Sequence, residues 1–132
     1  MIDKENEIYT RVYNKVIEAF PEAEMSGSFQ AVPSSFPAVT FYESDSYVPR
    51  QYDDGLKSKY EIVRYSVNVY SNKISGKKQE CKGILAVIDN EMQRMNFRRM
   101  ITTPVPNLND SSIYRLIAEY EAVISEDMFY KP

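Results

Sequence analysis

Residues 60–71, YEIVRYSVNVYS, carry the clearest structural pattern in the chain, because apolar and polar side chains alternate along them. The apolar series is Val63, Tyr65, Val67 and Val69, and the polar series between them is Arg64, Ser66 and Asn68. A period of two is typical of a β-strand that buries one face and exposes the other. The pattern therefore predicts a strand whose valine face lies on the hydrophobic core.

The period changes immediately after this strand, and the change predicts a helix. Residues 72–76 contain the turn-forming Asn72 and Gly76. Over residues 77–96 the apolar positions recur at steps of three and four, which is the spacing of one helix face. They are Cys81, Ile84, Leu85, Ile88, Met92 and Met95. We expect this stripe to lie on the sheet.

The N-terminal part of the chain predicts another helix and two strands. A helix is expected over residues 4–20, with Asp3 as its cap and Pro21 as its end. A short strand is expected over residues 29–32 and a clearer one over residues 38–43. Prolines surround both strands and indicate a sheet edge or a sharp corner, because proline cannot donate a hydrogen bond to a ladder.

The remaining segments complete the predicted fold. Residues 44–58 are predicted to form a long loop, and strands over residues 97–105 and 112–125 are predicted to pair as a hairpin. This order of elements predicts one α+β domain over residues 1–132, with an antiparallel or mixed sheet of four to five strands and two helices on one face. The longest strands extend roughly 40 Å, against about 36 Å for the diameter of such a domain, so we expect their ends to overhang and to favour a partner subunit.

Composition and charge exclude several classes of function. The chain has 16 Lys and Arg against 19 Asp and Glu, a net charge of −3, which gives no basic field for nucleic acid. It has one cysteine, no apolar signal-like run at its start and no apolar stretch of membrane-spanning length. These features predict a cytoplasmic protein without a membrane partner and without sequence-specific nucleic-acid binding.

The residues that usually carry catalysis are scarce. The chain has no histidine, which removes the usual general base near neutral pH and histidine-ligated metal sites. Cys81 lies on the apolar stripe of the second helix, where a thiol is normally inert. Ser75 and Lys78 match a Ser-x-x-Lys pattern, but a turn leading into a helix explains them better. The glycines match neither a Walker loop nor a dinucleotide fingerprint, so we expect no cofactor.

Three pairs of carboxylates stand out, and one of them is a candidate for chemistry. Asp53 and Asp54 lie in the predicted long loop. Glu119 and Glu121 share one face of the last predicted strand, where they suit a cation site or an acid and base pair. The same spacing occurs on any solvated or inter-subunit strand, and we favour that interpretation. Asp89 and Glu91 are predicted to flank the outer side of the second helix.

Candidate interface residues fall into two groups, and eleven tyrosines and six methionines favour contact surfaces in general. In the predicted loop the candidates are Tyr47, Arg50 and Tyr52, and we expect this loop to be mobile in the free subunit and to order on assembly. On the sheet they are Arg64, Arg98, Arg99 and Arg115, together with Glu119 and Glu121. Two interpretations of the arginines remain open. They form salt bridges with Glu119 and Glu121 of a neighbouring subunit, or they are a charged rim that keeps the sheet solvated.

A set of short runs, taken in order over residues 38–124, carries a resemblance to a known family. The runs are Tyr70-Ser71-Asn72-Lys73 before Gly76-Lys77-Lys78, Ile84 to Ile88-Asp89 with Met92, Phe97-Arg98-Arg99, Pro106-Asn107 with Asp110, Ile113-Tyr114-Arg115, and Tyr120-Glu121-Ala122-Val123-Ile124. They resemble the small tail-completion proteins of long-tailed bacteriophages and of prophages of Gram-positive bacteria.

The resemblance implies a tail terminator similar to the lambda-type minor tail proteins. Such a protein is a structural α+β subunit of a hexameric ring that caps the tail tube, stops its elongation and joins the tail to the head. The implied partners are copies of the chain itself, the tail tube protein and the head-tail connector proteins, in the host bacterial cytoplasm during assembly and at the neck of the virion. The family implies no catalytic residues and no cofactor.

Three alternatives remain open at the level of sequence. A head closure or head-tail adaptor subunit has a similar size and order of elements. A host regulatory domain with the sheet face as a ligand pocket is a different class of function. An enzyme that uses Glu119 and Glu121 is the third.

Overall fold

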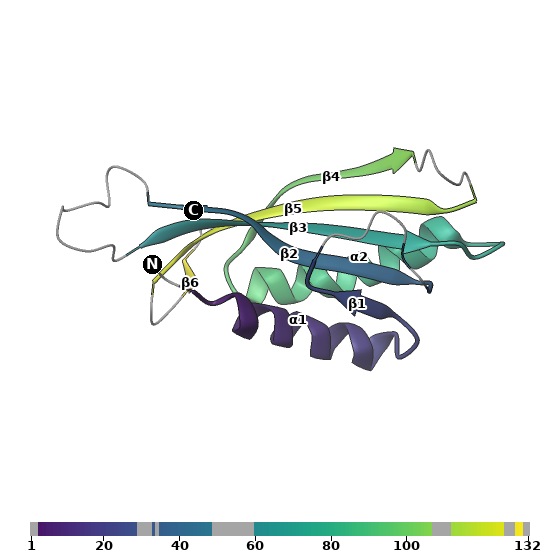
Figure 1. Cartoon of the computed structure of the whole chain (residues 1–132), viewed down its shortest axis with the longest axis horizontal. Helices are drawn as coiled ribbons and strands as arrows, with labels where there is room; N and C mark the ends of the chain where they lie inside the picture. The colour runs from purple at the N-terminus through teal and green to yellow at the C-terminus, as the bar shows by residue number, and fades with distance from the viewer. Residues whose placement is uncertain are drawn as a thin grey trace.

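Helices α1 and α2 lie against one face of a single twisted sheet (Figure 1). The structure is a computed structural model that describes residues 3–28, 33, 35–48, 60–106, 112–125 and 129–130. The elements in chain order are α1 (Glu5–Ala19), β1 (Glu24–Ser26), β2 (Ala38–Tyr47), β3 (Glu61–Ser71), α2 (Lys77–Arg94), β4 (Arg98–Pro106), β5 (Tyr114–Ile124) and β6 (Phe129–Tyr130).

The sheet has the strand order β1-β2-β3-β5-β4, with the two-residue β6 beside the end of β5. β1 runs parallel to β2, and all other neighbours are antiparallel. A mixed sheet with two helices confirms the predicted α+β class, and the predicted hairpin of the last two long strands is the observed β4–β5 pair. Neither described helix has the length and apolar character needed to cross a membrane.

The core lies between the helices and the valine face of β3, as the alternation predicted. Ile8, Val12 and Val16 of α1 are fully buried and meet the stripe of α2 and the inward residues of β2, β3 and β5. A row of aromatic rings crosses this layer: Phe41 stacks on Tyr65 with centroids 5.1 Å apart, and Phe97 meets Tyr65 edge-on at 5.5 Å. Aromatic pairs at these distances add stability beyond the area that they bury.

The ends of the helices follow from local chemistry. The N-cap of α1 is Lys4 and not the predicted Asp3, but Asp3 Oδ1 still accepts a hydrogen bond of 3.1 Å from the Glu5 amide of the first turn. Gly76 has φ +87° before α2, and Asn96 has φ +65° after it. Glycine and asparagine are the residues that tolerate this left-handed region most readily, so α2 ends at Arg94, before the predicted residue 96.

The structure corrects the prediction for the segment that was expected to be a loop. Ser44, Asp45, Ser46 and Tyr47 belong to β2, which pairs with β3. Their register shifts between Glu43 and Asp45, and all four are exposed, so no apolar period marked them as a strand. β1 was also missed, because three half-buried residues are too short for a periodic signal. The strand predicted over residues 29–32 lies outside the described residues.

Candidate functional site

A row of alternating charges crosses the sheet on the face turned away from the helices. Strand register places Asp45 of β2 beside Arg64 of β3, Arg64 beside Glu121 of β5, and Glu121 beside Arg98 of β4. Arg64 Nε lies 3.6 Å from Glu121 Oε2, and the Glu121 side chain is only 10% exposed while that of Arg64 is 45% exposed. The row begins with an anion at β2 and ends with a cation at β4.

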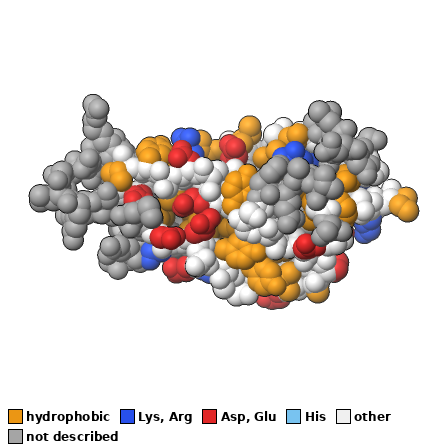
Figure 2. Space-filling model, viewed as in Figure 1, with side chains coloured by type: hydrophobic (Ala, Val, Ile, Leu, Met, Phe, Trp, Pro, Cys, Tyr) orange, Lys and Arg blue, Asp and Glu red, His pale blue; other side chains and the backbone are white. Residues whose placement is uncertain are grey.

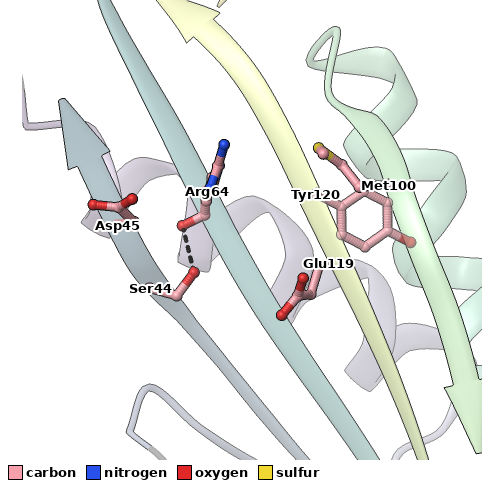
Figure 3. Close-up of a pocket in the computed structure, with 6 residues that line it drawn as sticks. All are labelled: Ser44, Asp45, Arg64, Met100, Glu119 and Tyr120. Carbon is pink, nitrogen blue, oxygen red and sulfur yellow. Dashed lines mark hydrogen bonds between the residues drawn. The ribbon is translucent and has the colours of Figure 1, made fainter. Parts of the chain in front are cut away.

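A shallow hollow of about 210 Å³ lies beside this row (Figure 3). Its lining residues are Ser44, Asp45, Arg64, Met100, Glu119 and Tyr120. Ser44 Oγ donates a hydrogen bond of 3.2 Å to the carbonyl oxygen of Arg64, so this hydroxyl is engaged with the neighbouring strand. The hollow is smaller than the roughly 300 to 1,000 Å³ of typical small-molecule pockets.

Glu119 and Glu121 share a face of the sheet, as their spacing predicted, but their surroundings differ. Glu119 is exposed at the rim of the hollow, whereas Glu121 is buried to 7% exposure and paired with Arg64. An acid and base pair needs two carboxyl groups that approach one substrate. Among the residues that the structure describes, no group of three or more potential ligands is placed to hold a metal ion.

The structure divides the four sheet arginines between different partners. Arg98 is exposed on the face of the charge row, where its guanidinium lies 4.0 Å from Met100 Sδ. Arg99 points to the other face, and its Nη1 lies 3.4 Å from Asp89 Oδ1 of α2. Neighbouring residues of a strand face opposite sides, so Arg98 and Arg99 do not form one cluster.

Arg115 and Tyr47 have partners within the subunit. Arg115 donates from Nη2 and Nε to Asn68 Oδ1 at 2.8 and 3.1 Å and lies over the Tyr70 ring at 5.6 Å. Tyr47 is 39% exposed at the end of β2, with Arg64 over its ring at 5.6 Å. Arg50 and Tyr52, the other two candidates of the predicted loop, lie outside the described residues, as do residues 49–58 of the loop that was expected to be mobile.

Asp89 and Glu91 do not lie on the outer side of α2, and this prediction was wrong. Glu91 is 5% exposed and accepts hydrogen bonds of 3.0 and 3.2 Å from Arg11 of α1. Asp89 accepts a hydrogen bond of 2.8 Å from the Tyr120 hydroxyl. Both carboxylates connect α2 to other elements, and a helical period built on apolar residues alone does not mark such positions.

A second hollow of about 260 Å³ lies between α2 and β4. It is lined by Lys82, Leu85, Ala86, Asp89, Asn90, Arg99, Thr102 and Leu116. Two of its polar groups, Asp89 and Arg99, pair with each other at 3.4 Å, and Asp89 also accepts a hydrogen bond of 2.7 Å from Gln93. Cys81 is fully buried in the core nearby, as predicted, and burial followed by the charge of Glu80 raises the pKa of its thiol to about 12. A thiol with this pKa is a poor nucleophile near neutral pH.

Acidic side chains gather between the middle of β2 and the start of α1 (Figure 2). The Glu43 amide donates a hydrogen bond of 3.1 Å to Glu5 Oε2, which holds the two residues together. Burial, and then the charges of Glu5, Asp3, Glu61 and Asp45, raise the pKa of Glu43 from 4.5 to about 7. The edge of the sheet at β2 therefore carries a surplus of negative charge.

Replacing Glu43 by glutamine is expected to raise the free energy of unfolding at pH 8 by about 1 kcal/mol, a value reduced for solvent screening of a half-buried group. The folded protein is more stable when Glu43 is protonated than when it is charged. The stabilisation of the folded protein by protonated Glu43 is therefore complete below pH 4.5, and it is lost as the pH rises to about 7. Urea unfolding between pH 4 and 8 measures this. The exposed Glu22→Gln is the control, and an equal pH slope in wild type and Glu43→Gln would contradict the assignment.

No protein-family model and no curated protein matches this chain.

Proposed function

We propose that this chain is a tail terminator, or tail completion protein, of a long-tailed bacteriophage or prophage. In this proposal it is a structural subunit that forms a closed, hexameric ring on the end of the tail tube, stops elongation of the tube and joins the tail to the head connector. The ring assembles in the cytoplasm of the host bacterium and remains at the neck of the virion. Its partners are copies of itself, the tail tube protein and the connector.

The observation that carries the proposal is where the charged residues lie. The charge row of Asp45, Arg64, Glu121 and Arg98 lies on an open face of the sheet, and its two ends are on exposed stretches of β2 and β4. The two hollows, of about 210 and 260 Å³, are both below the usual size of a small-molecule site. A subunit with two unlike surfaces can make head-to-tail contacts that close into a ring. The order of short runs over residues 38–124 supports the same proposal.

Electron microscopy of the purified protein mixed with tail tubes tests this function. We expect ring-shaped density on one end of each tube, and we expect tubes to stop growing when the protein is added during polymerisation of the tube protein. Protein heated until it unfolds, then added in the same amount, is the control for non-specific binding. Tubes that bind no protein and continue to lengthen would contradict the proposal.

The same preparation separates the alternatives. A head closure or adaptor subunit would bind purified head connectors and leave free tube ends bare. A regulatory domain would be a monomer or dimer that retains a small metabolite in native mass spectrometry and ignores both structures. An enzyme based on Glu119 and Glu121 would lose turnover in the Glu119→Gln/Glu121→Gln double variant while its assembly stayed intact.

A further inference from the structure

Among the residues that the structure describes, no strand covers either edge of the sheet in one and the same half. On the β2 edge, β1 covers residues 38–40 only, so that no described strand pairs with β2 from Phe41 to Tyr47 on that side. Residues that are paired across β2, β3, β5 and β4 form a row. The rows that start at the covered residues 38–40 of β2 end at residues 103–105 of β4. Pro104 and Pro106 have no amide hydrogen, so they restrict ladder formation at this end of β4. The uncovered rows that start at residues 41–45 of β2 end at residues 98–102, where β4 contains no proline.

The two open edges carry opposite charges, and these charges lie at the two ends of the same rows. On the open face one row runs from Asp45 to Arg98. On the helix face the next row runs from Glu43 through Tyr65 and Tyr120 to Arg99, whose side chain is 48% exposed despite its contact with Asp89. Each row therefore has an acidic end on β2 and a basic end on β4, and the two edges are complementary.

The strand directions permit two copies to meet along these edges. β2, β3, β5 and β4 are successively antiparallel, so β4 runs opposite to β2. When a second copy keeps the orientation of the first and lies beside it, its β4 is antiparallel to the β2 of the first. The contact is heterologous, because different surfaces meet, and repeated contacts of this type close into a ring when the rotation allows it.

We propose that a second copy of this chain docks its β4 against the open part of β2, with Arg98 of one copy beside Asp45 of the next. This inference rests on the proposed ring function and assigns the surface that builds the ring. The row of alternating charges then continues from subunit to subunit. Arg99 of one copy meets Glu43 of the next on the other face, which supplies a cation to the acidic cluster at the start of α1.

Two bulges shape this contact. The register of β2 shifts between Glu43 and Asp45, and that of β4 shifts between Arg99 and Ile101. Bulges increase the local twist and interrupt regular pairing, so they limit the backbone ladder to a few residues and disfavour a flat, unlimited sheet. Side-chain charges therefore set the register, and association is expected to weaken as salt is raised.

A mixing experiment with two opposite variants tests the contact. Arg98→Glu alone brings two carboxylates together at every contact, and Asp45→Arg alone brings two guanidinium groups together. Each variant is therefore expected to self-associate about 30-fold more weakly than wild type. In an equimolar mixture every contact between unlike copies is attractive, because it joins either the two introduced charges, which are opposite, or the native Arg98 and Asp45. Sedimentation velocity is expected to show assembly restored to within about threefold of wild type.

Matched variants control for charge and for folding. The exposed Lys78→Glu and Glu22→Arg make the same charge changes away from the edges and are expected to assemble as wild type does. Circular dichroism verifies that each variant is folded, and the neutral Arg98→Gln and Asp45→Asn, expected to weaken association by a smaller factor, replace any variant that is not.

The outcomes separate this inference from the proposed function. A wild-type assembly that is unaffected by both edge variants, or two weakened variants that the mixture does not restore, overturns the β2–β4 contact and leaves the ring function standing. Restored assembly that binds no tube end supports the contact and overturns the tail function. A wild-type chain that stays monomeric at high concentration, with and without tubes, overturns both.

Discussion

Replacing Phe41 by alanine is expected to lower the free energy of unfolding by about 4 kcal/mol. Phe41 is 1% exposed and stacks on Tyr65 at 5.1 Å, with Tyr9 of α1 6.3 Å away on another side. Alanine removes these contacts and leaves a cavity between α1 and the middle of the sheet, where rings on several elements prevent complete collapse. A loss of this size is a large fraction of the total stability of a small domain.

Urea unfolding followed by circular dichroism measures this loss. Tyr13→Ala is the matched control, because Tyr13 also stacks on Tyr9, at 6.0 Å, but is 38% exposed. We expect the control to lose about 1 kcal/mol, in keeping with an exposed aromatic pair. Equal losses for the two variants would show that the layer between α1 and the sheet is not the main core.

Removing one hydroxyl from each of two buried tyrosines is expected to have opposite effects. Tyr65 and Tyr120 are both fully buried and are opposite each other on β3 and β5. The Tyr120 hydroxyl donates to Asp89 Oδ1 at 2.8 Å, whereas the Tyr65 hydroxyl has no hydrogen-bond partner among the described residues. Tyr120→Phe should destabilise the fold by about 2 kcal/mol, and Tyr65→Phe should stabilise it by about 1 kcal/mol.

The pair provides its own control, because each substitution removes one oxygen atom from a phenol ring in the same layer. Thermal and urea unfolding of both variants give the two signs. Asp89 retains Arg99 at 3.4 Å in Tyr120→Phe, so we expect the protein to remain folded. Destabilisation of Tyr65→Phe by as much as Tyr120→Phe would mean that the Tyr65 hydroxyl has a partner in solution.

Long periodic segments could be predicted from the sequence because burial of one face imposes the period. β3, β5 and α2 lie where the alternation and the helical stripe indicated. The outer half of β2 could not be predicted, since its residues are exposed on both faces and only their ladder with β3 makes them a strand. Neither β-propensity nor hydrophobic periodicity predicts the pairing of this segment with β3.

The arrangement of the charged residues was only partly predictable. Alternation placed Glu119 and Glu121 on one face, but it did not show that Glu121 is buried beside Arg64. The charge row depends on a register among four strands, including bulges that no local pattern revealed. Tyr47 and the sheet residues remain predictions as interface positions, because contact between copies is not a property of one chain.

The pairing of β3 with β5 has a consequence for synthesis on the ribosome. One neighbour of β3 in the sheet, β2, is translated before it, whereas the other neighbour, β5, is translated only after α2 and β4. Until β5 emerges, β4 also lacks its only strand partner in the described fold. Contacts between distant parts of a chain form late. The four long strands therefore form one continuous sheet only after β5 has emerged from the ribosome.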